Sequence, residues 1–329
     1  MPFEPVLTGH VRKRNSFTLD FYRANDVGYE GLRKAVTTLK PNDVIEQVKA
    51  SGLRGRGGAG FPAGMKWQVV LKDTPKPKYI CCNADESEPG TFKDHVLMER
   101  NPHLLIEGCV IACHAIGAKT TYIYIRGEFY HVQRRLEEEI EAARKAGYVG
   151  KNILGSGFDC EVFVFRGAGA YEAGEETALV EALEGKRAQP RIKPPFPAVA
   201  GLWNSPSAVN NDETLCNVPL IIRNGADWFA KIGPEKNGGP KLFCVSGHVE
   251  RPGTFETSMH TTLRELIYDP KYAGGIRGGK KLKCVIPGGS SVPVLLPDQL
   301  DIPASFDGVA AAGPMLGSAG IIVMDESTC

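Results

Sequence analysis

The chain has 329 residues, of which 42% are apolar, and its 39 basic and 38 acidic side chains leave a net charge of +1. This balance gives no footprint of nucleic-acid binding, and no apolar run approaches the roughly 18 residues of a membrane span. The N-terminus has no features of a signal or transit peptide. We therefore expect an intracellular cofactor enzyme with one large and one smaller domain.

Apolar spacing and a glycine stop predict a helix over 42–52, and a loop with five glycines follows it at 51–62. Glycine lets a backbone approach a ligand closely, and free N–H groups beside Arg54, Arg56 and Lys66 would suit a phosphate. The loop contains G-x-G-x-x-G, but the dinucleotide fingerprint follows a strand. We expect a nucleotide cradle of another design, with a flexible surface connection as the alternative.

A short apolar strand is predicted at 79–82, and it leads into Asn83, Asp85, Glu86 and Glu88. Three carboxylates so close together are a costly concentration of like charge. Ligands of open α/β sheets bind at the carboxyl ends of the strands. We expect these side chains to hydrogen-bond ribityl or ribose hydroxyls; a solvated acidic turn is the alternative.

The next elements alternate between the two types of secondary structure. An apolar helix is predicted at 104–115, a strand at 121–125, a helix at 132–146 and a strand at 160–165. This alternation predicts a mostly parallel sheet with helices on both faces.

A second glycine loop follows the strand at 160–165 and carries Tyr171. Glu175 and Glu176 then precede a helix predicted over 177–183. Acidic residues in a first helical turn are favoured by the helix dipole, so simple capping is the alternative to a ligand role for both glutamates.

The proline-rich segment 188–206 is expected to be extended. The segment 207–214 is predicted to be a polar loop before a helix, where Asn210, Asn211 and Thr214 could hold a phosphate. An ordinary Asn-rich turn is the alternative.

The character of the chain changes after residue 237. A strand is predicted at 241–249, a short helix at 262–267, and a strand with a tight turn at 282–289, to which we assign no site. The nine cysteines show neither C-x-x-C pairs nor cluster spacing, so we expect free thiols.

Together these segments resemble the NADH-binding flavoprotein subunit of respiratory complex I, whose relatives include diaphorase subunits of NAD-reducing hydrogenases and of soluble formate dehydrogenases. The resemblance covers residues 1–329. It implies an α/β fold, with a Rossmann-like FMN- and NADH-binding domain and a mostly parallel sheet at 1–237, followed by a small β-grasp (ubiquitin-like) domain at 238–329.

The resemblance also implies the site residues, position by position. Those implied for FMN are Gly55, Gly57, Lys66, Asn83, Asp85, Glu88, Gly174, Glu175, Glu176, Val209, Asn210, Asn211 and Thr214. Those implied for NADH are Phe61, Glu86, Tyr171, Glu175, Lys193 and Phe196. The chain departs from the family at Val69, where an aromatic residue is common, and at Glu172 and Ala173, which have no assigned role.

The implied activity is that of an NADH:quinone oxidoreductase subunit, in which NADH gives a hydride directly to FMN. No side chain is therefore expected to act as a general acid or base, and Glu88 and Glu175 would serve as positioning groups. The acidic residues would repel a ribose 2′-phosphate, which favours NADH over NADPH.

Electrons would then pass singly to iron-sulfur clusters and quinone in the full complex. The expected partners are the two-iron cluster subunit and the large iron-sulfur subunit, and the expected location is cytoplasmic, on the inner face of the cell membrane through the complex, without direct insertion. The family's C-terminal helical domain, which binds a four-iron, four-sulfur cluster, has no counterpart in 1–329, so no metal ligands are expected. The alternatives are a hydrogenase or formate dehydrogenase diaphorase, and a non-catalytic truncated relic or assembly protein.

Overall fold

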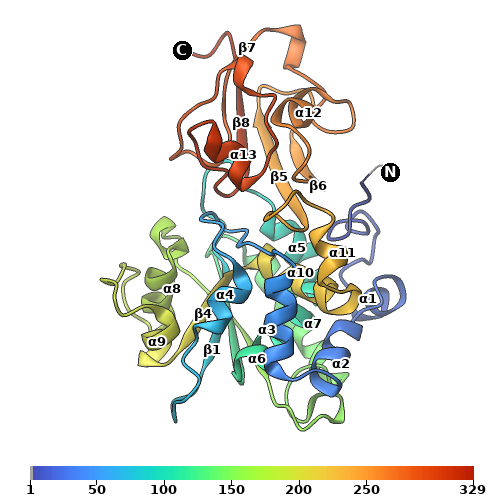
Figure 1. Cartoon of the computed structure of the whole chain (residues 1–329), viewed down its shortest axis with the longest axis vertical. Coiled ribbons are helices and arrows are strands. Elements are labelled where there is room, and N and C mark those ends of the chain that lie inside the picture. The colour runs from blue at the N-terminus through green and yellow to red at the C-terminus, as the bar shows by residue number, and fades with distance from the viewer. Residues whose placement is uncertain (1–2) are drawn as a thin grey trace.

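The computed structural model describes residues 3–329, which contain two four-stranded sheets (Figure 1). The first sheet is all-parallel, with strand order β3-β2-β1-β4, as the alternation of strands and helices predicted. Its strands are β1 (Tyr79–Ala84), β2 (Thr120–Ile125), β3 (Glu161–Arg166) and β4 (Ser207–Asn211). Tyr79 pairs with Thr120 of β2 and Ser207 of β4, so the carboxyl ends of these strands lie level along one edge.

The helices of this part of the chain pack on the two faces of this sheet or against one another. They are α1 (Leu19–Asn25), α2 (Glu30–Thr37), α3 (Pro41–Ala50), α4 (Ala63–Gln68), α5 (Asp94–Arg100), α6 (Pro102–Ile116), α7 (Tyr130–Lys145), α8 (Glu176–Leu183), α9 (Pro197–Ala200), α10 (Asp212–Asn224) and α11 (Ala226–Ala230), with 3-10 turns η1 (Ile153–Gly155), η2 (Tyr171–Gly174) and η3 (Leu202–Asn204). Ile80 and Cys82 of β1 belong to the large core shared with α6 and α10, whereas Cys81 belongs to the smaller core shared with α8. Coverage on both sides explains why β1 is apolar at successive positions.

Two predicted segments differ from the structure. Residues 207–211 were expected in a polar loop, but they form β4 because their backbone pairs with β1 and their asparagines find buried partners. Residues 188–206 were expected to be extended throughout, but they include α9 and η3. Pro197 occupies the first turn of α9, where a missing N–H costs no hydrogen bond.

The second sheet has strand order β6-β5-β8-β7 and lies above the first in Figure 1. Its elements are β5 (Pro240–Gly247), β6 (Gly253–Ser258), α12 (Leu263–Tyr268), η4 (Arg277–Gly279), β7 (Leu282–Ile286), η5 (Pro297–Gln299), α13 (Phe306–Ala311) and β8 (Gly320–Asp325). The central strands β5 and β8 are parallel, and β6 and β7 flank them antiparallel. A hairpin, a helix and two further strands around a parallel central pair make the expected β-grasp arrangement.

Buried charged groups connect strands of the second sheet to the N-terminal segment and to α10. The Glu256 carboxylate of β6 accepts hydrogen bonds from the backbone N–H groups of residues 6–8, at 2.7–3.1 Å, and from the Thr8 hydroxyl. Lys241 of β5 pairs with Glu213 of α10 at 2.7 Å, and both side chains are fully buried.

Seven of the nine cysteines are buried, and all nine are free thiols. Within the described residues, no helix is long and apolar enough to cross a membrane. Over the same range, 3–329, no three His, Cys, Asp or Glu side chains gather in a way that could hold a metal ion.

Candidate functional site

Three adjoining cavities form a cleft along the carboxyl edge of the parallel sheet. The acidic cavity, of about 350 Å³, is lined by segment 83–94, by the loop after β3, and by Ser318 of the second sheet's domain. The glycine-loop cavity, of about 190 Å³, lies against residues 55–61, and the apolar cavity, of about 420 Å³, reaches α9. Neighbouring cavities share lining residues such as Asn211 and Lys66, so the cleft is continuous.

The cleft brings together nearly all the residues that sequence pointed to. The acidic cavity is lined by Gly57, Asn83, Asp85, Glu86, Glu88, Tyr171, Gly174, Glu175 and Asn211. The glycine-loop cavity is lined by Gly55, Gly57, Phe61, Lys66, Asn83, Gly174, Glu176, Val209, Asn210, Asn211 and Thr214, and the apolar cavity adds Phe196 and Val69. Lys193 is absent from these linings but bonds to Glu175 and Glu176. The individual ligand contacts remain predictions.

Hydrogen bonds from the backbone and from two arginines fix the conformation of the glycine loop. The Gly55 N–H donates to the Phe61 carbonyl at 2.8 Å. Arg54 donates to the Gly60 carbonyl at 2.7 Å, and the buried Arg56 donates to backbone carbonyls of residues 238 and 240. Both arginines therefore brace the loop from outside the cleft instead of facing a phosphate.

The backbone N–H groups of residues 57–60 have no protein acceptor within the described chain, although these residues line the glycine-loop cavity. A side chain at Gly58 would meet nothing within 4 Å, and the φ of +153° at this position suits glycine. Successive unpaired N–H groups beside Lys66 make a concavity that suits an anion.

The three acidic residues after β1 have different roles in the structure. Glu86 is buried, and its carboxylate accepts the N–H groups of Lys93, Asp94 and His95 at 2.5–3.1 Å, so it caps α5. Burial opposes its ionisation, but the His95 hydrogen bond and the charge of Lys93 outweigh this and lower the pKa of Glu86. Both oxygens of Glu86 therefore accept hydrogen bonds from the start of α5, and the contact with NADH that the resemblance implies stays a prediction.

Asp85 and Glu88 are oriented toward the acidic cavity. The Oδ2 atom of Asp85 is buried without a hydrogen-bond partner among residues 3–329, and burial raises the pKa of this carboxyl to about 6. Glu88 accepts the hydroxyl of Tyr171 on one oxygen and the N–H of Ser290, at 2.6 Å, on the other. Glu88 therefore links the loop after β3 to the β-grasp domain across the cavity.

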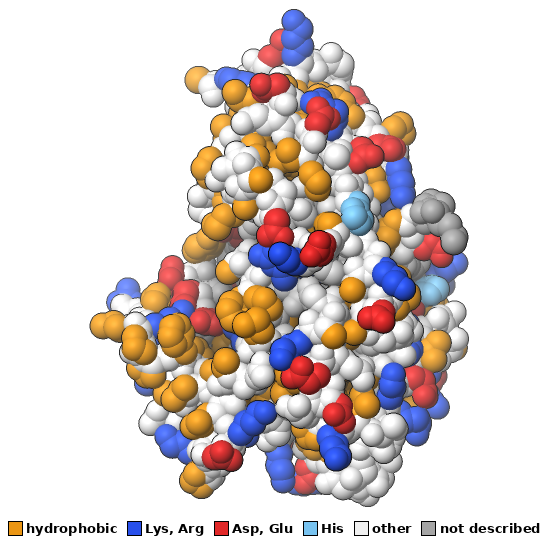
Figure 2. All heavy atoms as spheres, viewed as in Figure 1, with side chains coloured by type: hydrophobic (Ala, Val, Ile, Leu, Met, Phe, Trp, Pro, Cys, Tyr) orange, Lys and Arg blue, Asp and Glu red, His pale blue; other side chains and the backbone are white. Residues whose placement is uncertain are grey.

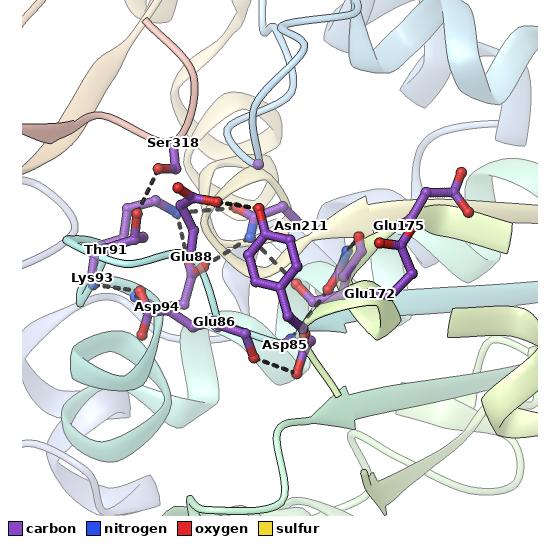
Figure 3. A pocket seen from close by; sticks show the side chains of 15 residues that line it. Asp85, Glu86, Glu88, Thr91, Lys93, Asp94, Glu172, Glu175, Asn211 and Ser318 are labelled. Carbon is purple, nitrogen blue, oxygen red and sulfur yellow. Dashed lines mark hydrogen bonds and ion pairs between the residues drawn. The ribbon is translucent and has the colours of Figure 1, made fainter. Parts of the chain in front are cut away.

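Sequence reasoning missed a buried charge cluster behind the acidic cavity. Lys93 bonds to Asp94 Oδ1 at 2.6 Å and to Glu213 Oε2 at 2.8 Å, and Lys241 also reaches Glu213. Burial opposes ionisation of Glu213, but Lys241 and Lys93 lower its pKa to about 2. The only signal for Lys93 and Asp94 is their position just after the acidic segment, since their partners lie far along the chain. Figure 3 shows Thr91, Lys93 and Asp94 on one side of the cavity and Glu172 and Glu175 on the other.

A second charged network lies between the glycine loop and α8. Lys66 donates to Glu176 at 2.9 Å and to the Val209 carbonyl at 3.0 Å, and Lys193 donates to Glu175 and Glu176. The other oxygen of Glu175 accepts N–H groups at the start of α8. The capping role considered for Glu175 is therefore present, and Lys193 holds its remaining oxygen.

Exposed aromatic side chains border the cleft. Phe61, Tyr171 and Phe196 are 49%, 55% and 56% exposed, which is unusual for large apolar side chains and leaves their faces available for stacking. Figure 2 shows the molecule hollowed between the upper domain and the lobe that carries α8 and α9, with hydrophobic side chains on that lobe.

These features fit a flavin mononucleotide and a nicotinamide dinucleotide. The free N–H groups of residues 57–60 and Lys66 supply an anion site, and the Asp85 and Glu88 carboxylates that line the acidic cavity supply acceptors for a hydroxyl or ring N–H. The aromatic border supplies flat apolar surface.

Comparison with known proteins gives two family matches. The family described as Nuo51 FMN-binding domain matches residues 48–220, and the SLBB domain family matches residues 241–323.

The chain is similar over its length to proteins named as the F subunit of NADH-quinone oxidoreductase. It is 56% identical to the second such F subunit of Rhizobium meliloti (strain 1021), over 99% of this chain and 77% of that protein. It is 53% identical to the F subunit of Streptomyces coelicolor, over 99% of this chain and 71% of that protein. Among solved structures, an air-oxidized NAD+-reducing [NiFe]-hydrogenase matches with a TM-score of 0.81 and 34% identity, over 99% of this chain. The present chain spans about half, 52%, of the matched hydrogenase chain.

Proposed function

The chain belongs to the F-subunit family of NADH-quinone oxidoreductases. On this premise we propose that it binds FMN and NADH side by side in the cleft. We propose further that it acts as the NADH dehydrogenase module of a larger enzyme. The observation that carries the proposal is the glycine-loop cavity, where the N–H groups of residues 57–60 lack acceptors in the described part of the chain and lie beside the Lys66 ammonium. This is the chemistry that a flavin phosphate requires.

The remaining FMN contacts follow from the walls of the two inner cavities. Asn83 and Gly174 line both the glycine-loop and the acidic cavities, and Asp85 lines the acidic cavity, where a ribityl chain and a flavin ring would continue from the phosphate. The Asn83 amide is oriented by its bond to the Gly174 carbonyl at 2.7 Å. When bound, FMN supplies the ring nitrogen that accepts the hydride of NADH.

NADH would lie against the aromatic border of the apolar cavity. Phe61 and Phe196 offer stacking surface there, and Lys193 offers a cation near Glu175. The carboxylates of the acidic cavity disfavour a ribose 2′-phosphate, which supports NADH over NADPH. Val69 also lines the apolar cavity and provides aliphatic surface in place of the family's aromatic residue.

The protein's own contribution to the reaction is positioning. Direct hydride transfer needs closeness and alignment, so no general acid or base is required. Glu88 fixes Tyr171 across the acidic cavity, and Glu175 is fixed by Lys193 and by the start of α8. These bonds hold the two walls at a set separation while the ligands are aligned.

The relatives are named as subunits, so a multisubunit assembly is the setting we propose. The partners would be the two-iron cluster subunit and the large iron-sulfur subunit, which together carry electrons on to quinone. A four-iron, four-sulfur cluster of the kind implied by the family would belong to the same electron path. The location would be cytoplasmic, at the inner face of the cell membrane through those partners.

A diaphorase of an NAD-reducing hydrogenase is the second candidate, because the solved hydrogenase shares the whole fold of this chain. The two candidates use the same cleft and differ in partners. Affinity purification of the chain from its native cells, followed by identification of partners by mass spectrometry, distinguishes iron-sulfur subunits of complex I from hydrogenase subunits.

The cofactor proposal is tested by titrating the purified chain with FMN and with riboflavin while following quenching of flavin fluorescence. We expect tight FMN binding and much weaker riboflavin binding, because riboflavin lacks the phosphate. NADH-dependent reduction of ferricyanide should then require added FMN. Equal affinity for the two flavins would contradict the phosphate cradle, and activity without FMN would contradict the function.

A further inference from the structure

The Asn211 carboxamide lies where three parts of the cleft meet. Asn211 ends β4, caps α10 and lines both the acidic and the glycine-loop cavities. A Cβ atom placed on Gly57 would lie 2.9 Å from the Cβ of Asn211, so the glycine loop rests directly on this side chain.

All four hydrogen-bonding positions of this carboxamide are used inside the protein. Its Nδ2 donates to Asp94 Oδ2 at 2.9 Å and to the Asn83 carbonyl at 3.3 Å. Its Oδ1 accepts the Glu213 N–H at 3.1 Å and the Lys93 ammonium at 3.3 Å. An amide offers two donors and two acceptor lone pairs, so the group is saturated, and a flipped amide would face donors with donors.

Lys93 and Asp94 are themselves fixed in place. Their side chains are 1% and 5% exposed and pair at 2.6 Å, and Glu213 holds Lys93 at 2.8 Å. Lys241 of the β-grasp domain holds Glu213 in turn. The orientation of Asn211 is therefore set by a buried charge network that reaches from the parallel sheet into β5.

We propose that Asp94 and Lys93 are positioning residues for the cofactor: by binding the Asn211 carboxamide they fix residue 211, whose Cβ lies against Gly57, and so hold the glycine loop in the position that receives the FMN phosphate. The proposal rests on the function proposed above and gives Asn211 a supporting role in addition to its place in the cavity wall. It also gives the β-grasp domain, through Lys241 and Glu213, a part in setting the cofactor site.

The test is a double-mutant cycle on FMN affinity, measured by fluorescence quenching after wild-type binding is established. Asp94→Asn and Asn211→Ala are each expected to weaken FMN binding about tenfold or more, since each removes hydrogen bonds to a charged group. The Ala variant keeps the Cβ beside Gly57 and removes only the carboxamide that anchors residue 211. Because Asp94 acts through Asn211, the double variant should bind no more weakly than the weaker single variant.

Glu107→Gln is the matched control, since Glu107 is a buried carboxylate that bonds to Tyr22 and to the start of α2, away from the cleft. It is expected to lower thermal stability without changing FMN affinity. A second test is Asn211→Asp, which places a carboxylate at residue 211 against the carboxylate of Asp94 and should weaken FMN binding. Adding Asp94→Asn restores an amide–carboxylate pair with the two groups exchanged, and FMN affinity should recover. This result does not depend on whether Asp94→Asn folds on its own.

Unchanged FMN affinity in Asp94→Asn, additive losses in the cycle, or no rescue by the exchanged pair would each overturn the proposal. Absence of FMN binding by the wild-type chain would overturn the proposed function and this inference together, and it is seen before any variant is made.

Discussion

Replacing Glu86 by glutamine separates a structural role from a ligand role at one position. Glu86 Oε1 accepts the N–H groups of Lys93 and Asp94, and Oε2 accepts the N–H and ring nitrogen of His95. In Glu86→Gln one oxygen is kept, while an NH2 group faces the His95 donors. Leaving a buried donor without an acceptor costs about 1–3 kcal/mol, and more where the lost partner is charged, so we expect a loss of about 2–4 kcal/mol.

The loss can be read as a melting temperature. An unfolding entropy of about 2.1 cal/mol/K per residue corresponds to roughly 0.7 kcal/mol/K for a chain of this length, so the expected decrease in Tm is about 3–6 °C. The affinity for NADH, measured on protein loaded with FMN, should change little, because the carboxylate is turned to α5. An unchanged Tm with clearly weakened NADH binding would show that Glu86 does not stabilise α5 and would favour the NADH contact implied by the family resemblance.

The same variant carries a pH signature. The pKa of Glu86 is lowered, so its stabilising contribution is present above its ordinary pKa of about 4.5 and is lost as the pH falls through the lower folded value. The hydrogen bond to Glu86 raises the pKa of His95, so that contribution is present below about 6.5 and is lost as the pH rises through the folded value. The difference in unfolding free energy between wild type and Glu86→Gln should therefore be largest near pH 5–6, as measured by denaturant titration across pH.

Three further predictions concern other parts of the cleft and its supports. Lys66→Met should weaken FMN binding about tenfold or more in fluorescence titrations while the exposed-lysine control Lys186→Met leaves it unchanged; equal affinities would remove Lys66 from the phosphate site. Burial raises the pKa of Asp85, so ionisation of this carboxyl costs stability as the pH increases. Asp85→Asn should therefore raise the free energy of unfolding at pH 7 by about 1 kcal/mol, after allowance for partial exposure. This gain should vanish below about pH 4, where the carboxyl is protonated in both the folded and the unfolded chain. Glu256→Gln should speed limited proteolysis before residue 18 and lower the free energy of unfolding by about 1–3 kcal/mol, because one buried acceptor for the N–H groups of residues 6–8 is lost. Unchanged cleavage would show that Glu256 does not hold the N-terminal segment in place.

Much of the fold could be predicted because local pattern and burial agree. The apolar run at 79–82 lies between helices on both faces and extends as β1 to Ala84, and the helices expected at 104–115 and 132–146 appear as α6 and α7. The polar sequence of residues 207–211 led to the wrong expectation because its asparagines are satisfied only by distant groups, such as Trp67 Nε1 for Asn210. A strand with buried amides cannot be recognised before those partners are placed.

The location of the candidate site could be predicted from the sequence, but the directions of its side chains could not. Glycines, acids and aromatics gathered in short segments indicated the cleft, and the level carboxyl ends of the parallel strands bring these segments together. The direction of each side chain was not predictable. Arg56 turns inward to carbonyls of residues 238 and 240, and Lys93 finds Glu213 far along the chain. Both directions depend on tertiary contacts that spacing alone does not encode.

The proposed function requires that the cleft hold FMN next to NADH. The most direct measurement is anaerobic addition of one equivalent of NADH to the FMN-loaded, desalted chain while the visible flavin absorbance is recorded, with NADPH added to a parallel sample. We expect flavin to remain bound after desalting, NADH to bleach it, and NADPH to bleach it far more slowly. Retained flavin that NADH does not bleach, or equal bleaching by both nucleotides, would contradict it.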